Sequence, residues 1–388
     1  MERTERIYMD HAATTPVTEK ALAAMLPLFR EEFGNPSAIY DYGQTSKNIL
    51  ESCRKRFARC IGALSSEIFF TSGGTESDNW VIRSTLKLKG AKGRHIITTA
   101  IEHNAVLRTL SQMEEEGFEV TCLTPDAQGH ITPDQLENAI RPDTILITIM
   151  LANNVVGTVL DIPALARVAA RHHIWFHTDA VQAVGHIPIK VHQLGVDFLS
   201  VSAHKFGGPK GTGALYCRLP NHLPALLTGG GQEKEQRSGT ENIPGIVGMT
   251  AALEEAVEDM PQEAGRLIAM RNRIIESLCS IPGVKLTGDP ENRLPGFASF
   301  MVEGIGHSVY IVNALNEKGI CVSSGSACSA SSREASHVLL AMGYDAKQAA
   351  GALRITLGRD NTKEQVDHLL SVLPDVILRQ REAQLHAK

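Results

Sequence analysis

The sequence lacks any apolar run approaching the roughly 20 residues that a membrane-spanning helix requires. Its first six residues are mostly charged, and no apolar segment typical of a signal peptide follows them. The formal net charge is only −5, so the composition predicts no basic face for direct binding to nucleic acid or to a membrane surface. We therefore expect a cytoplasmic protein that binds neither.

The seven cysteines form no CxxC pair and are odd in number, which argues against a disulfide framework and against a zinc site. We expect no metal centre of any kind. Six of the cysteines occur in apolar or helical contexts, where small buried side chains are predicted: Cys53, Cys60, Cys122, Cys217, Cys279 and Cys321.

The seventh cysteine, Cys328, has a different context. Ten of the twelve residues from Val322 to Arg333 are Ser, Gly, Ala or Cys. This stretch offers little to pack, so the segment at about 323–333 is predicted to be an exposed, mobile loop. A thiol on such a loop is available as a nucleophile where its surroundings favour the thiolate.

The sequence also lacks internal repeats and low-complexity segments, and its 388 residues are too many for one typical core. Short apolar runs alternate with helical patterns in the first two thirds, which predicts an α/β domain with a mostly parallel sheet. The predicted strands are 68–71, 95–99, 118–123, 144–150, 174–177, 198–201 and 213–217. We expect a large α/β domain over 15–260, and a smaller α+β domain made of 1–14 and 261–388. Two long helices, 243–260 and 263–279, are predicted at the junction.

Two polar residues that follow neighbouring predicted strands carry the main functional signal. Lys205 comes after the run that ends at Val201, and Asp179 comes after the run that ends at Phe176. A lysine in a partly dry pocket can form a Schiff base, because desolvation frees its amine lone pair. An acid and a lysine on successive strand ends commonly hold pyridoxal phosphate, with the acid keeping the pyridine nitrogen protonated. By itself, a lysine beside glycines is better interpreted as an ordinary solvated loop lysine, and the Asp179 stretch reverses that preference.

Other polar stretches also follow predicted strands, where ligands of parallel sheets bind. Gly74 and Thr75 open a helix whose free N–H groups suit a phosphate, and Ser202 and His204 are further donors. Each of the remaining candidates has a structural alternative. His103 is either a residue that stacks on a ring and transfers protons, or a polar residue at a helix start. Asn154 either orients a ligand or caps a turn. Arg354 either binds a substrate carboxylate or forms an ion pair.

Taken together, these stretches resemble NifS/IscS-type cysteine desulfurases, which are class-V aminotransferase-family enzymes with fold type I. The resemblance runs nearly end to end. It rests on residues 8–16, 33–36, 71–79, 102–103, 153–154, 177–182, 202–211, 237–242, 323–328 and 354–359. The Ser-Ser-Gly-Ser-Ala-Cys run before a long loop is similar to the NifS/IscS class and differs from the SufS class.

The resemblance implies pyridoxal 5′-phosphate as the cofactor and L-cysteine as the substrate. Lys205 would bond the cofactor aldehyde, Asp179 would pair with the pyridine nitrogen, Gln182 would bond the ring hydroxyl, and His103 would stack on the ring. Gly74, Thr75, Ser202 and His204 would hold the phosphate, together with Thr240 from the other subunit of a homodimer. Arg354, Asn154 and Asn35 would hold the substrate carboxylate. Cys328 would receive the sulfur as a persulfide while alanine leaves.

The resemblance leaves the sulfur acceptor open. The expected partner is a sulfur acceptor, either an iron–sulfur scaffold or a tRNA-thiolating enzyme. The chain stops at Lys388 without the longer tail of scaffold-binding IscS proteins, which argues against the scaffold and leaves a dedicated partner such as the tRNA-thiolating enzyme. Ala203, where the family often has glycine, is expected to be harmless. A pyridoxal phosphate aminotransferase or β-eliminating lyase is the alternative activity, because it needs Lys205 and Asp179 but not Cys328. A non-catalytic scaffold that kept the fold is the third possibility.

Overall fold

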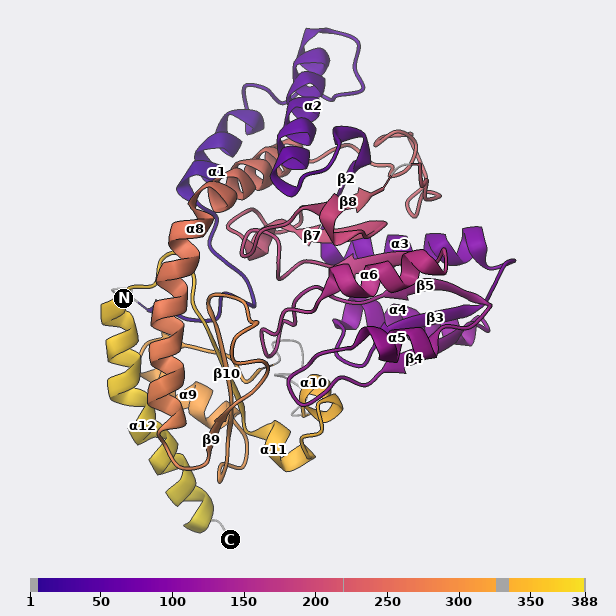
Figure 1. Ribbon diagram of the computed structural model, residues 1–388. Helices are drawn as coiled ribbons and strands as arrows, with labels where there is room; N and C mark the ends of the chain where they lie inside the picture. Colours follow the sequence, from indigo (N-terminus) through magenta and orange to yellow (C-terminus); the bar gives the residue numbers. More distant parts are fainter. Residues whose placement is uncertain (1–5, 219, 326–334, 387–388) are drawn as a thin grey trace.

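The computed structural model describes residues 6–218, 220–325 and 335–386. All seven predicted strands are present and form one sheet of order β2-β8-β7-β6-β5-β3-β4 (Figure 1). Their bounds are β2 Ile68–Thr71, β3 His95–Thr99, β4 Glu119–Leu123, β5 Thr144–Thr148, β6 Trp175–Asp179, β7 Phe198–Ser202 and β8 Gly213–Cys217. Strand β8 runs antiparallel to both neighbours and the other pairs are parallel, so the predicted mostly parallel α/β sheet is confirmed.

Helices cover both faces of this sheet because successive strand residues point to opposite sides. Ile97, Ile147 and Leu199 belong to a core cluster with α6 (Ile162–Arg171). Their neighbours Ile96, Leu146 and Phe198 belong to a second cluster with α3 (Gly74–Lys89) and α4 (Asn104–Glu115). The remaining helical elements of this part are α1 Glu19–Met25, η1 Leu26–Phe29, α2 Asp41–Ile61, η2 Ser65–Glu67, α5 Pro133–Ala139, α7 Val191–Leu194 and η3 Ala203–Lys205. Both faces of the sheet are therefore buried, as a parallel sheet requires.

The C-terminal part contains a three-stranded antiparallel sheet of order β12-β10-β9. The strands are β9 Val284–Leu286, β10 Phe297–Val302 and β12 Ala352–Thr356; the helices are α9 Val309–Glu317, α10 His337–Ala341, α11 Ala346–Ala350 and α12 Lys363–His386. A separate parallel pair joins β1 (Ile7–Tyr8) to β11 (Ile320–Cys321). The N-terminal strand β1 thus lies against the C-terminal part.

One predicted feature of the junction is wrong. Instead of two helices, α8 (Ile243–Cys279) runs through Pro261 as one helix of 37 residues, which Figure 1 shows passing from the large sheet region to the C-terminal part. Proline removes one helical hydrogen bond. The helix continues because its first half packs on α1 and α2 and its second half packs on β9, β10 and α12. The domain boundary at 260/261 stays a prediction.

The predicted burial of the cysteines holds only in part. Cys53 and Cys217 are buried and Cys60 and Cys321 are half-buried, whereas two cysteines are exposed. Cys122 is exposed because it lies on the edge strand β4, and Cys279 is the last residue of α8. In the three described ranges, no helix has both the length and the apolarity to cross a membrane.

Candidate active site

A cavity of about 270 Å³ lies at the carboxyl ends of the parallel strands. It is lined by most of the predicted site residues: Gly74, Thr75, His103, Asn154, Asp179, Gln182, Ser202, His204, Lys205 and Arg354. These residues come from six different segments of the sequence. The structure therefore brings together side chains that the strand pattern alone places only at one edge of the sheet.

Lys205 ends the short 3₁₀ turn η3 that directly follows β7. Its Nζ donates hydrogen bonds to the carbonyl oxygens of Ala12 at 2.6 Å and Ala13 at 2.8 Å. The N-terminal segment thus holds the amine at the cavity wall. Gln182 donates to the same Ala12 carbonyl at 3.0 Å, so the segment organises two of the predicted residues.

Asp179 is the last residue of β6 and is 5% exposed. Its Oδ1 accepts a hydrogen bond from the Val181 N–H at 2.9 Å. Burial raises the pKa of this carboxyl, while the positive charges that His103 and Lys205 can carry oppose the rise. A pyridinium N–H at this position would supply the cation that the buried carboxylate needs.

A second buried carboxyl, Asp78, lies beside Asp179 and was not singled out by the sequence analysis. The ligand atoms of Asp78, His103 and Asp179 lie within 4.8 Å of one another. Burial, followed by the charge of Asp179, raises the pKa of Asp78 well above its usual range. Its Oδ1 is 3.6 Å from His177 Nε2, but burial lowers the pKa of His177 to about 3, so this contact is not an ion pair at neutral pH. The spacing of Gly74 and Asp78, one helical turn apart, is the signal that indicates a shared face.

The phosphate candidates surround the start of α3. A Cβ on Gly74 would come within 2.4 Å of the Val181 side chain, and a Cβ on Gly213 within 2.5 Å of the Gly73 backbone, so both positions require glycine. A hollow beside the main cavity is lined by Thr14, Ser72, Gly73, Gly74, Thr75, Glu76, Ser202, His204, Lys210 and Gly211. Free N–H groups at a helix start and nearby hydroxyls suit a phosphate. The hydrogen-bond donors around this hollow, and the space left by the glycines, therefore fit the phosphate of the cofactor.

His103 and His204 are both held as neutral imidazoles. Burial lowers the pKa of His103, and burial followed by the Lys205 charge lowers the pKa of His204 to about 4. His103 caps α4, where its Nδ1 accepts a hydrogen bond from the Ala105 N–H at 3.1 Å. His103 thus starts a helix and also lines the cavity, while its ring-stacking role stays a prediction.

Arg354 forms the ion pair that was one of its two alternatives, and it also lines the cavity. It lies on β12, is 2% exposed, and donates to Asp10 Oδ1 at 2.8 Å and to the Asn154 carbonyl at 2.7 Å. Its Nε is buried and has no hydrogen-bond partner within the described residues. Of the two neighbouring amides, Asn153 caps the turn through Val155 and Val156, whereas Asn154 lines the cavity. A guanidinium that lines a cavity can bind a substrate carboxylate.

Comparison with known proteins gives the family. The description aminotransferase class-V matches residues 7–369. A protein named cysteine desulfurase IscS from Methanosarcina thermophila is 50% identical over 376 residues, which cover 97% of this chain and 93% of that protein. The chain belongs to the class-V aminotransferase family.

Solved structures agree with this family assignment. A structure titled NifS-like protein has a TM-score of 0.91 and 37% identity, covering 96% of this chain and all of that one. One titled SspA in complex with cysteine has a TM-score of 0.81 and 38% identity, covering 90% of this chain and 98% of that one. The predicted NifS/IscS resemblance and its fold type are therefore confirmed, and pyridoxal phosphate is the cofactor of this family.

Three of the predicted site residues are not placed in the cavity. Cys328 lies outside the described residues. Asn35 and Thr240 are exposed and do not line the cavity of their own chain. Their assigned roles remain predictions.

The loop that carries Thr240 is held in place by a buried ion pair. Glu233 accepts two hydrogen bonds of 2.7 Å from the Arg54 guanidinium and one of 2.9 Å from the Phe70 N–H. Both charged side chains are only 2% exposed. Because a buried pair with every partner in place fixes geometry, Thr240 is presented at a defined position on the surface.

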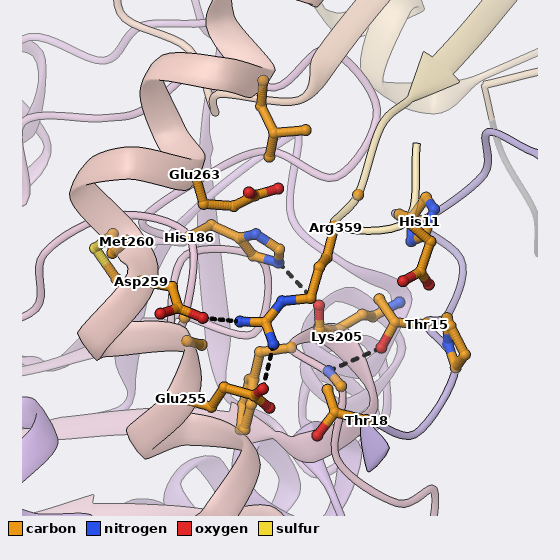
Figure 2. A pocket seen from close by; sticks show the side chains of 18 of the residues that line it. His11, Thr15, Thr18, His186, Lys205, Glu255, Asp259, Met260, Glu263 and Arg359 are labelled. Carbon is orange, nitrogen blue, oxygen red and sulfur yellow. Dashed lines mark hydrogen bonds and ion pairs between the residues drawn. The ribbon is translucent and has the colours of Figure 1, made fainter. Parts of the chain in front are cut away.

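A second cavity of about 440 Å³ also has Lys205 in its wall, but it collects few of the predicted residues (Figure 2). Three of its carboxylates are already paired with arginines: Glu255 and Asp259 bind Arg359 at 2.5 Å and 2.7 Å, and Glu263 binds Arg266 at 3.0 Å. Figure 2 shows Arg359 reaching across to the two α8 carboxylates. This larger cavity is therefore a junction between α8 and the C-terminal part, and the chemistry belongs to the smaller one.

Proposed function

We propose that this protein is a pyridoxal phosphate-dependent cysteine desulfurase, which removes sulfur from L-cysteine, releases L-alanine and leaves the sulfur on Cys328. The observation that carries the proposal is the meeting of Lys205, Asp179 and Arg354 in one cavity. These are the amine, the acid and the carboxylate binder that the reaction needs. Relatives named cysteine desulfurase over nearly the whole chain support the choice of substrate.

The chain's own residues divide the cofactor-dependent work among them. When bound, pyridoxal phosphate supplies an electron sink for the pair of electrons left at Cα after its proton is removed. Asp179 holds a proton on the pyridine nitrogen, and Gln182 and His103 orient the ring. Lys205 first bonds the aldehyde and, once displaced by the substrate amine, its free Nζ moves the Cα proton.

Arg354 and Asn154 orient the substrate through its carboxylate. Arg354 is fixed by Asp10 and by the Asn154 carbonyl, so little rotational freedom remains to be lost when a carboxylate binds. Gly325, at the start of the predicted loop, accepts a hydrogen bond from the same guanidinium at 3.3 Å. The chain that leads to Cys328 therefore departs from the side of the cavity where the substrate is held.

In the sulfur transfer, the Cys328 thiolate forms an S–S bond with the substrate sulfur as the substrate's C–S bond breaks. The two electrons of the C–S bond remain with carbon, which takes up a proton, so the product is alanine. The sulfur is reduced back to sulfide by a thiol or passed to an acceptor protein. No water is consumed, which distinguishes this route from elimination to pyruvate.

The discriminating experiment supplies the purified holoenzyme with L-cysteine and dithiothreitol. We expect alanine and sulfide in equal amounts and no pyruvate. Pyruvate, ammonia and sulfide would instead identify a β-eliminating lyase, and alanine formed only when a keto acid is added would identify an aminotransferase. A protein that neither absorbs in the visible region nor binds added pyridoxal phosphate would favour the non-catalytic scaffold.

We also propose that two copies of the chain form a homodimer. Large apolar side chains are exposed along α1, η1 and the entry to α2: Leu22, Leu26, Phe29, Phe33, Ile39, Tyr40 and Tyr42. A contiguous apolar surface of this kind marks an interface. A second copy that packs on this surface would supply its own Thr240 to the phosphate site. The Thr240 of the same chain does not line that site.

The dimer is tested by sedimentation. We expect wild type to sediment as two chains of 42.0 kDa, and the double variant Leu26→Asp/Phe29→Asp to dissociate and to bind pyridoxal phosphate at least about tenfold more weakly. Leu378→Asp, which changes an exposed apolar residue on α12, is the matched control and should remain dimeric. A fully active wild-type monomer would contradict the proposal.

The same chemistry indicates the chemical class of the physiological sulfur acceptor. A persulfide on Cys328 would pass to a protein thiol, either on an iron–sulfur scaffold or on a tRNA-thiolating enzyme. We propose that this sulfur transfer takes place in the cytoplasm.

A further inference from the structure

Three histidines line the active-site cavity, and the backbone partners of two of them, His103 and His337, assign these two opposite roles. His103 Nδ1 accepts from the Ala105 N–H, so in the neutral ring the proton is on Nε2. His337, the first residue of α10, has its Nε2 3.0 Å from the Glu102 carbonyl oxygen. A carbonyl only accepts, so Nε2 carries the proton and the basic nitrogen of His337 is Nδ1. His103 can therefore donate a proton, whereas His337 can accept one.

Every other charged or titratable group of this cavity already has a task under the proposed function. These groups are Asp78, His103, Asp179, His204, Lys205 and Arg354. Asp179 would pair with the pyridine nitrogen and has the buried carboxyl of Asp78 beside it, with their ligand atoms within 4.8 Å of one another. His204 lines the phosphate hollow and is bound to Thr14, and Arg354 would take the carboxylate. Lys205 is bonded to the cofactor before substrate arrives. Among the described residues that line the cavity, His337 is the base left without a task.

One proton transfer in the proposed reaction has no base assigned to it. L-Cysteine enters with its amino group as an ammonium ion, and that nitrogen has no lone pair with which to displace Lys205. A base in the cavity must accept one proton before the exchange can begin. Imidazole is the side chain suited to this transfer near neutral pH.

We propose that His337 is the base that removes the ammonium proton of the incoming amino acid. The proton moves from the substrate nitrogen to His337 Nδ1, which gives a neutral amine and an imidazolium held by the Glu102 carbonyl. No bond other than N–H changes, and no oxidant or reductant takes part. The proposal rests on the proposed function and assigns it a further catalytic residue.

The test compares two amines in wild type and in His337→Gln. The glutamine amide keeps an N–H donor for the Glu102 carbonyl but has no basic nitrogen. L-Alanine carries an ammonium group, whereas aminooxyacetate has a carboxylate and a nitrogen that is already unprotonated at neutral pH. The readout is the rate at which the visible spectrum of the bound cofactor changes on mixing, which needs no turnover.

We expect His337→Gln to react with L-alanine about 100-fold more slowly than wild type. We expect its rate with aminooxyacetate to stay within about threefold of wild type, and added imidazole to restore part of the alanine rate. His130→Gln, which changes a histidine outside the cavity, is the control and should match wild type with both amines.

Two results would overturn the assignment. Unchanged rates with both amines would show that His337 transfers no proton, and equal slowing with both would show that it only supports the shape of the cavity. Failure of the proposed function is seen separately, because it requires that wild type release no alanine from L-cysteine.

Discussion

Lys205→Ala is expected to abolish the covalent attachment of the cofactor and to lower alanine formation at least about 1000-fold. The alanine side chain can neither bond the aldehyde nor move the Cα proton, so two steps fail together. The cavity itself is kept, because Asp179, Gln182 and the glycines around the phosphate hollow belong to other segments. The variant should therefore still bind pyridoxal phosphate, but with the absorbance of the free aldehyde.

The measurement is a visible spectrum before and after borohydride, which fixes the cofactor to a lysine only where a Schiff base exists. Wild type should retain the label after denaturation and Lys205→Ala should lose it. Lys92→Ala, which removes a lysine that does not line the cavity, is the control. A labelled Lys205→Ala protein would show that another lysine holds the cofactor.

The positions of the strands and of the candidate site were predictable from the sequence. Short apolar runs with polar residues at their ends predict β6 and β7, and the carboxyl ends of adjacent parallel strands meet at one edge of a sheet. Asp179 and Lys205 could therefore be brought together without coordinates. The same reasoning gave the Gly74–Thr75 turn, since a helix start next to a strand end is a local feature.

What the sequence did not show is which distant segment each side chain meets. Lys205 bonds the carbonyls of Ala12 and Ala13, and Arg354 bonds Asp10, across more than 190 intervening positions. A periodic pattern encodes the face of an element but not its partner, so such contacts have no local signature. His337 was missed for this reason: its role depends on the carbonyl of Glu102, 235 residues away.

Cys328→Ala is expected to abolish alanine formation from L-cysteine, by at least about 1000-fold, while leaving the cofactor spectrum unchanged. Alanine has no sulfur to form the S–S bond, so the substrate's C–S bond keeps its electrons and the amino acid dissociates intact. Lys205, Asp179 and Arg354 are not altered, so the bound cofactor should still change its spectrum when L-cysteine is added. This combination separates the sulfur step from all steps before it.

The control is Cys321→Ala, which removes the half-buried thiol of β11 seven positions earlier in the chain and should retain turnover. Cys328 follows Gly325 by three residues, so chain length alone keeps the two Cα atoms within about 11 Å. The Gly325 carbonyl accepts a hydrogen bond from Arg354 in the cavity wall, so the last described residue before Cys328 lies at this cavity. Wild-type turnover by Cys328→Ala would remove Cys328 from the mechanism. Loss of turnover in Cys321→Ala alone would assign the acceptor to β11 instead.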